Sequence, residues 1–119
     1  MKFLEYQAKK VFAEAGIPTL KGIVARTPEQ ARRAAEELGG AAVVKAQVPI
    51  GGRGKAGGVA VVKSAADAER EAARILSMEI RGYPVKELLI EQAADIKAEF
   101  YLGVTVDRAK QAPVLILSP

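Results

Sequence analysis

The 119-residue sequence contains no cysteine, no histidine and no tryptophan. Without cysteine and histidine, the chain forms neither disulfides nor Cys/His zinc sites, and it has no imidazole to act as a general base. No segment approaches the ~20 consecutive apolar residues that span a membrane, and the start of the chain lacks the apolar core of a signal peptide. We therefore expect a soluble, cytoplasmic protein with no membrane partner, whose chemistry depends on carboxylates, amines, guanidinium groups and the backbone.

Aromatic residues make up only 5% of the sequence, whereas 50% of the residues are hydrophobic and 27% are charged. This is the composition of a globular protein, and the length predicts a single domain, residues 1–119. The net charge of +4 lies in one stretch, because no acidic residue occurs between residues 38 and 66. The four basic residues there are Lys45, Arg53, Lys55 and Lys63. A field concentrated in this way favours a small, multiply charged anion over a nucleic-acid duplex.

The spacing of apolar residues predicts an α+β fold. We expect helices over residues 3 to 15, 28 to 38 and 65 to 78, with Thr27 and Ser64 as the caps of the second and third. The first helix carries an apolar stripe that should pack on a core. The residues of this stripe are Leu4, Ala8, Val11, Phe12 and Ala15.

Strands are expected over residues 21 to 26, 41 to 48, 59 to 62 and 87 to 92. Gly82-Tyr83-Pro84 is interpreted as a break in the chain. Residues 99 to 107 alternate between apolar and polar side chains, which predicts one buried face, and residues 113 to 117 should return as the second strand of a hairpin. The result is a mostly antiparallel or mixed sheet with helices packed on one side. Because an apolar strand stands at the end of the sequence, we expect a fragment of a longer subunit.

A stretch with five glycines and three cations, residues 43 to 62, connects two of the predicted strands. Glycine lets the backbone approach a ligand closely, and successive N–H groups can converge on an anion. Lys45 lies in the apolar strand before the glycines, where a buried amine requires an anion. We interpret the stretch as a glycine-rich hairpin that binds phosphates; the alternative is a flexible surface hairpin with solvated cations.

Residues 52 to 57 match the pattern G-x-G-x-x-G, which by itself is weak evidence. A Rossmann loop opens a helix, whereas these glycines precede a β-branched run. A Walker A loop needs Ser or Thr after its Gly-Lys pair, and Ala56 stands at that position. What remains is a hairpin that folds over a triphosphate, with a lysine from the preceding strand, as in protein kinases and ATP-grasp enzymes.

Four blocks of sequence carry a resemblance to a known family: LEYQAKKVFAEAGIP, VVKAQV, GGRGKAGGV and LLIEQAADIKAEFYLGVTVDR. In this order they resemble the start of the β subunits of succinyl-CoA synthetases, which are ATP-grasp ligases, and the resemblance covers essentially the whole chain. It implies the N-terminal lobe of an ATP-grasp domain. By the same resemblance, Lys45 contacts nucleotide phosphates, and Gly52, Arg53 and Gly54 form the loop that covers them.

The resemblance also implies roles for three residues after the phosphate loop. Glu91 would bind nucleotide at the hinge strand, Ala94 would contact the base through its backbone, and Glu99 would lie near the ribose hydroxyls. From the residues alone, both glutamates would be interpreted as solvated acids at strand ends. Neither a catalytic residue nor a metal ligand is expected within the chain.

The reaction implied by the resemblance converts succinyl-CoA, phosphate and nucleoside diphosphate to succinate, CoA and nucleoside triphosphate. A partner α subunit carries the phosphohistidine and the CoA site, the cofactor is ATP or GTP, and the Mg²⁺ ligands lie on a second lobe. Because phosphoryl transfer depends on positioning and on the metal, we expect these residues alone to be inactive.

Two alternatives remain at this point. The first keeps the family and changes the substrate, because malate- and citrate-activating CoA ligases share this nucleotide lobe. The second is a basic module that binds RNA or another polyanion. Few features favour the second, since no aromatic residues lie among the loop cations to stack on bases.

Overall fold

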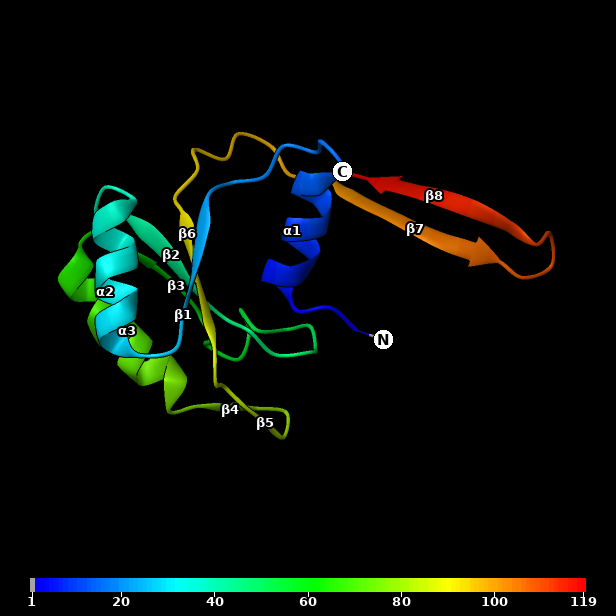
Figure 1. The fold of residues 1–119 in the computed structure, drawn as a ribbon. Helices are drawn as coiled ribbons and strands as arrows, with labels where there is room; N and C mark the ends of the chain where they lie inside the picture. The colour runs from blue at the N-terminus through cyan, green and yellow to red at the C-terminus, as the bar shows by residue number, and fades with distance from the viewer. Residues whose placement is uncertain (1) are drawn as a thin grey trace.

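The computed structural model describes residues 2–119, and its main body is a four-stranded antiparallel sheet in the order β1-β6-β2-β3 (Figure 1). The strands are β1 (Gly22–Ala25), β2 (Ala42–Ala46), β3 (Val59–Val62) and β6 (Leu88–Gln92). Two helices, α2 (Pro28–Glu37) and α3 (Ala65–Leu76), pack against each other and cover one face of the sheet. The predicted α+β fold is confirmed, and α2 and α3 lie on one side of the sheet as expected, whereas α1 does not.

The core lies between this sheet face and the two helices. Val44 of β2 pairs in register with Ile90 of β6, and both side chains are fully buried. The helices meet them through small side chains, which let each helix axis approach the sheet closely. These are Ala31, Ala34 and Ala35 of α2 and Ala68 and Ala72 of α3. These alanines follow the helix period, which puts them on one side of each helix.

Both helices begin at the predicted caps. Thr27 Oγ1 accepts a hydrogen bond from the Gln30 backbone N–H, and Ser64 Oγ accepts one from the Asp67 backbone N–H, each at 3.1 Å. Each bond satisfies a donor that has no partner inside its helix. The Gln30 side chain accepts from the backbone N–H of Arg26 at 2.8 Å, one residue before the position that a capping box uses.

Helix α1 (Glu5–Glu14) lies on the opposite side of the sheet from α2 and α3 (Figure 1). The expectation that its apolar stripe packs on a core is wrong. Within residues 2–119, no side chain of α1 is buried, and Val11 and Phe12 are 47% and 49% exposed. Amphipathic spacing identifies the apolar side of a helix but not what covers it. Helix α1 instead forms hydrogen bonds and ion pairs with the sheet side of the chain.

The last two strands, β7 (Tyr101–Asp107) and β8 (Ala112–Ser118), form the predicted hairpin, which projects away from the sheet (Figure 1). The expected buried face is wrong. Residues on one side of this hairpin, which we call the apolar hairpin face, are each about two-thirds exposed or more. They are Leu102, Val104, Val106, Leu115 and Leu117. Alternation had correctly indicated an apolar side, but no other described residues bury it.

A further short hairpin, β4 (Glu79–Ile80) and β5 (Tyr83–Pro84), was not predicted. Its turn, Arg81-Gly82, has positive φ at both residues, 49° and 84°, which is typical of a tight two-residue hairpin turn. Ile80 from this hairpin packs against Gly58. A Cβ added to that glycine would lie 2.7 Å from Ile80 Cδ1 and 3.2 Å from the Cβ of Ala46.

Among residues 2–119, no helix has both the length and the apolar character needed to cross a membrane.

Candidate functional site

Five charged side chains meet between α1 and the face of the sheet opposite α2 and α3, and we call them the ion-pair cluster. Lys45 Nζ lies 2.8 Å from Glu91 Oε1 and 3.0 Å from Glu5 Oε1. Arg53 Nη1 lies 2.7 Å from Glu5 Oε2, and the Lys9 amine pairs with Glu91 Oε2. Each carboxylate of the cluster therefore lies between two cations.

The alternation of side chains along the strands puts these groups on one face. Val44 points to the core, so its neighbour Lys45 points to the other face, toward α1. In β6, Ile90 points to the core and Glu91 points toward α1. Glu5 and Lys9 are four residues apart in α1, a spacing that puts both on one side of a helix. The alternation of side chains along the strands and the spacing of four residues along the helix thus bring opposite charges together.

Burial and charge act in opposite directions on the two titrating groups at the centre of the cluster. Burial by itself would raise the pKa of Glu5, but hydrogen bonds and charge from Lys45 and Arg53 outweigh it and hold that pKa below its ordinary value. Burial would likewise lower the pKa of Lys45, but Glu91 and Glu5 raise it above its ordinary value. Both groups are therefore charged at neutral pH.

The backbone around the cluster is held by side chains of its own. Arg53 Nη1 also donates to the carbonyl oxygen of Ala46 at 2.8 Å, which ties the glycine-rich loop back to the end of β2. Gln47 Oε1 accepts from the backbone N–H of Tyr6 at 3.1 Å, which ties the start of α1 to the same strand end. The guanidinium group of Arg53 is consequently fixed close to the amine of Lys45.

The glycine-rich loop between β2 and β3 exposes Gly51, Gly52 and Gly54, and two further arginines lie beside it. Gly52 has a φ of +78°, and a Cβ added there would lie 3.2 Å from Nη2 of Arg81. A Cβ added at Gly54 would meet open space. Arg74 of α3 donates to the carbonyl oxygen of Gly57 at 3.0 Å. The loop is therefore exposed, flanked by cations and open to a ligand.

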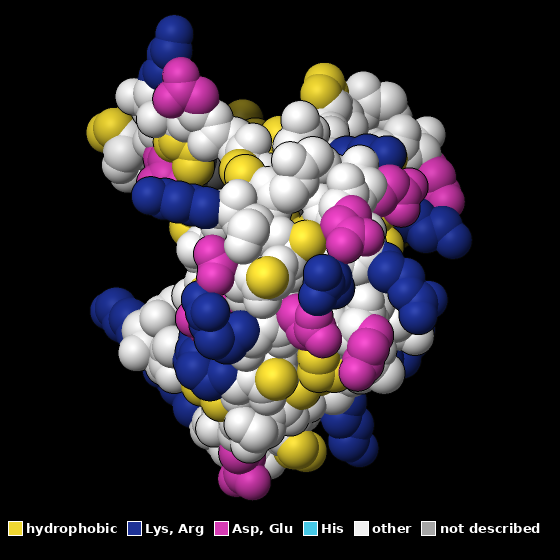
Figure 2. Space-filling model, turned by 90° about the vertical axis from the view of Figure 1, so that its left-hand side faces the viewer, with side chains coloured by type: hydrophobic (Ala, Val, Ile, Leu, Met, Phe, Trp, Pro, Cys, Tyr) yellow, Lys and Arg dark blue, Asp and Glu magenta, His cyan; other side chains and the backbone are white. Residues whose placement is uncertain are grey.

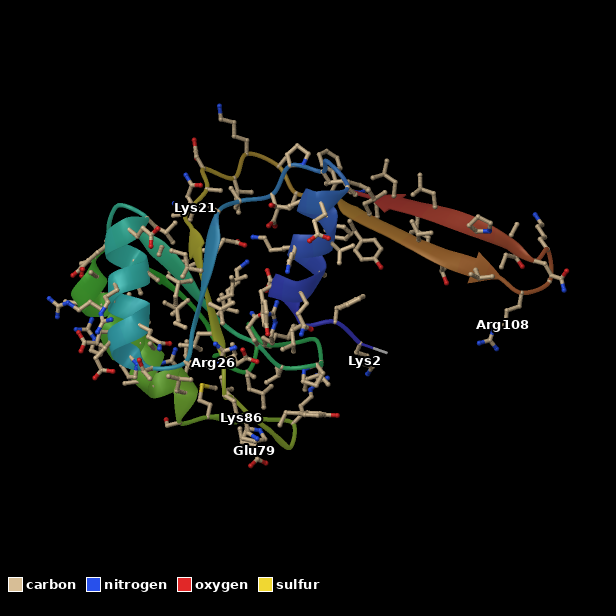
Figure 3. All side chains as sticks on the ribbon, in the orientation of Figure 1. Lys2, Lys21, Arg26, Glu79, Lys86 and Arg108 are labelled. Carbon is tan, nitrogen blue, oxygen red and sulfur yellow. The ribbon has the colours of Figure 1, made fainter. Side chains whose placement is uncertain are left out.

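Two open clefts lie on either side of the ion-pair cluster. One, of about 460 Å³, is lined by Glu5, Arg53, Lys2 and the loop residues that follow β2. The other, of about 380 Å³, lies between α1 and β1, with Lys9 and Lys21 among its lining residues. Figure 3 labels Lys2, before α1, and Lys21, just before β1, one for each cleft. The cluster thus borders both clefts.

The structure brings together three of the residues singled out from the sequence: Lys45, Arg53 and Glu91. The other four do not join them. Gly52 and Gly54 lie exposed in the loop. Ala94 and Glu99 are exposed in the segment between β6 and β7, and Glu99 pairs with none of the cations in residues 2–119.

Sequence reasoning missed Glu5, Lys9, Arg74 and Arg81. For Glu5 and Lys9 a signal existed, because their spacing of four residues puts both on the polar side of an amphipathic helix. The position of Arg81 could not be read from the sequence, since strands of two residues are too short to show a period.

The arrangement is suited to binding an anion. Two guanidinium or ammonium groups lie within 3.0 Å of a single carboxylate, beside an exposed glycine-rich loop. Guanidinium and ammonium groups bind phosphate oxygens as they bind carboxylate oxygens. Across residues 2–119, no group of three or more acidic side chains is placed to hold a metal ion.

The helix-covered side of the molecule differs from this site. Figure 2 shows that side, on which acidic and basic side chains are interspersed. Arg32, for example, pairs with Glu69 at 2.9 Å and with Glu36 at 3.3 Å. Balanced pairs of this kind do not form the one-sign patch that nucleic-acid binding uses, so this side gives no support to a polyanion-binding module.

Similarity to known proteins extends over the whole chain. The sequence is 53% identical over 118 residues to the β subunit of the ADP-forming succinate–CoA ligase of Rubrobacter xylanophilus and 50% identical to that of the GDP-forming enzyme of Thermus thermophilus. In both cases the match covers 99% of this chain and 31% of the relative. The chain thus spans about a third of the length of these relatives.

The fold also resembles a solved structure, the dinucleotide-forming acetyl-coenzyme A synthetase 1 of Ca. Korarchaeum cryptofilum in complex with coenzyme A, Ca-AMPCP and HgCl⁺. The TM-score is 0.83 at 23% identity, and the match covers 98% of this chain and 53% of that one. The ATP-grasp domain family matches residues 2–119. The chain therefore belongs to the ATP-grasp family, and its sequence is similar to the N-terminal portion of succinate–CoA ligase β subunits.

Proposed function

We propose that this chain is the nucleotide-binding part of the β subunit of an ADP- or GDP-forming succinate–CoA ligase. In this proposal Lys45 and Arg53 bind the phosphates of ATP or GTP, and the backbone at Gly52 and Gly54 covers them. One observation supports this most directly: two cations, from β2 and from the loop, lie 3.0 Å and 2.7 Å from the same carboxylate. That spacing suits two oxygens of one phosphate group.

Glu91 would bind the nucleotide at the hinge strand, Ala94 would contact the base through its backbone, and Glu99 would lie near the ribose hydroxyls. The position of Glu91 in the ion-pair cluster supports a role for it beside the phosphates. For Ala94 and Glu99 the support is their exposure in the segment after β6, where a ligand can reach them. The cleft between α1 and β1 has apolar lining residues, Leu20 and Leu89, that suit a base.

The remaining parts of the reaction would come from outside these residues. We assign residues 1–119 to the N-terminal part of one ATP-grasp domain whose remaining chain covers the apolar hairpin face. Mg²⁺ would be held by ligands in that remaining chain. An α subunit would supply the phosphohistidine and the CoA site, and the assembly would work on succinate in the cytoplasm as part of the tricarboxylic acid cycle. Residues 1–119 alone would then show no ligase turnover, because positioning and metal are both required.

The test uses the full-length β subunit with its α subunit and measures ATP binding by calorimetric titration and turnover by a coupled ligase assay. Lys45→Ala should weaken ATP binding and turnover by on the order of 100-fold, since it removes a charged donor to phosphate. Lys63→Ala is the matched control, because Lys63 is exposed and makes no ion pair in the described part of the chain. Turnover retained in Lys45→Ala would remove Lys45 from the mechanism.

A further inference from the structure

Glu5 stands between the two cations that the proposed function gives to the phosphates. Its Oε1 lies 3.0 Å from Lys45 Nζ and its Oε2 lies 2.7 Å from Arg53 Nη1. Only 24% of its side chain is exposed, and Oε2 is buried against Arg53. A carboxylate in this position uses the same two donors that a phosphate group would use.

The helix that carries Glu5 is attached to the sheet by polar contacts. Tyr6 N–H donates to Gln47, and Lys9 pairs with Glu91. None of the described side chains of α1 is fully buried, although Leu89, on the side of β6 that faces α1, is only 2% exposed. Release of the first turn of α1 therefore requires another partner for its charges and exposes some apolar surface.

The charges of the cluster set the direction of the effect. Lys9, Lys45 and Arg53 carry three positive charges, and Glu5 and Glu91 carry two negative ones. Removing the charge of Glu5 would raise the net charge of the cluster from one positive charge to two. A nucleotide phosphate entering beside Glu5 would meet a like charge at close range, which disfavours its binding.

We propose that Glu5 is an internal counter-anion of the phosphate site, that nucleotide phosphate displaces it from Lys45 and Arg53, and that this displacement releases the first turn of α1. The proposal rests on the proposed function, because it requires that these two cations bind phosphate. It makes Glu5 a residue that lowers nucleotide affinity, whereas a residue that positions the cations would raise it.

The direction in which one substitution changes the affinity for ADP distinguishes these two roles. ADP is titrated into the full-length protein as wild type, Glu5→Gln and Glu14→Gln. Glu5→Gln keeps the shape of the side chain and removes its charge, and ADP should bind on the order of tenfold more tightly. Glu14→Gln makes the same charge change in the same helix, at a residue that pairs with no cation in residues 2–119, and should change the affinity less than about twofold. Weaker or unchanged binding in Glu5→Gln would overturn the proposal.

A second measurement needs no variant. Amide hydrogen exchange of the wild-type protein is followed with and without ADP, at the Tyr6 N–H and along α1. Displacement of Glu5 predicts faster exchange in α1 when ADP is present, and protection of these amides would contradict it. If the wild type binds no ADP, the proposed function fails and this inference fails with it. A different combination of results would separate the two. If the wild type binds ADP, if Lys45→Ala abolishes that binding, and if Glu5→Gln weakens it, then the proposed function stands and only this inference fails.

Discussion

Replacing Lys45 by methionine should destabilise the folded chain by about 1–2 kcal/mol. Methionine keeps most of the aliphatic stem, so the change isolates the charge. The side chains of Lys45 and Glu91 are only 20% and 8% exposed. Their ion pair should therefore contribute more to the free energy of unfolding than the range of about 0–1 kcal/mol that is typical of surface salt bridges. Removing one partner of a fully buried pair costs about 3–5 kcal/mol. The cost is expected to be lower here, because Glu91 retains Lys9 and Glu5 retains Arg53.

The assay is urea unfolding of the 119-residue chain at neutral pH, followed by helical circular dichroism, which reports on α2 and α3. Lys63→Met is the control, and the exposed position of Lys63 predicts a change within about 0.5 kcal/mol. A double-mutant cycle with Glu91→Gln should give a coupling energy of about 1 kcal/mol or more. High salt should reduce this coupling only slightly, since buried pairs are screened less than exposed ones.

A coupling energy near zero would refute the reasoning, because it would mean that water separates the two groups and that the cluster has no fixed geometry. A control variant as destabilising as Lys45→Met would refute it differently, by showing that the loss of any lysine in this region has the same effect.

Three further predictions test other parts of the structure. Gly58→Ala should lower the free energy of unfolding by about 1–3 kcal/mol, since the added methyl enters a filled space, whereas Gly51→Ala should have a small effect because its Cβ meets nothing within 4 Å. Val104→Lys on the apolar hairpin face should reduce self-association of the 119-residue chain in sedimentation experiments and leave its thermal midpoint unchanged, and equal association would contradict this. For the pH dependence, the lowered pKa of Glu5 contributes stability that is present above its ordinary value of 4.5 and is lost as the pH falls through the lowered folded pKa. The raised pKa of Lys45 contributes stability that is present below 10.5 and is lost as the pH rises through the raised folded pKa, so urea midpoints should be flat between these limits and fall outside them.

Much of the fold could be predicted because its signals are local. Thr27 and Ser64 each cap a helix through a residue three positions later, and the alanine stripes of α2 and α3 follow the helix period. The register of the β7–β8 hairpin follows from alternation and a short turn. Burial could not be predicted in the same way. Val104 and Phe12 lie on apolar sides of their elements, but whether such a side is covered depends on long-range packing.

In the candidate site, too, residues with a local signal could be predicted and residues that depend on long-range packing could not. Lys45 could be predicted because a lysine within an apolar strand is conspicuous, whereas the role of Arg53 was implied only by the resemblance of its loop to the family. The role of Glu5 could not be predicted, since its contact with Lys45 joins residues 40 positions apart and depends on where α1 docks. The spacing of Glu5 and Lys9 identifies their side of the helix but not a partner, and an acid at the start of a helix already has a local explanation in the helix dipole.

The two sides of the sheet are held by different forces, and this difference bears on function. Helices α2 and α3 are held by apolar burial, which a bound anion hardly changes. Helix α1 makes its ion pairs through Glu5 and Lys9 and a hydrogen bond through the Tyr6 N–H, so its docking depends on the charge present at the cluster. Thermodynamic linkage makes such a dependence reciprocal: if phosphate weakens the docking of α1 by some factor, the docked α1 weakens phosphate binding by the same factor. Glu5→Gln should tighten ADP binding by a certain factor. That factor should therefore be the upper limit of the change that ADP causes in the hydrogen-exchange rate of α1 by displacing Glu5. A larger change in exchange would mean that ADP also acts on α1 through a contact other than Glu5.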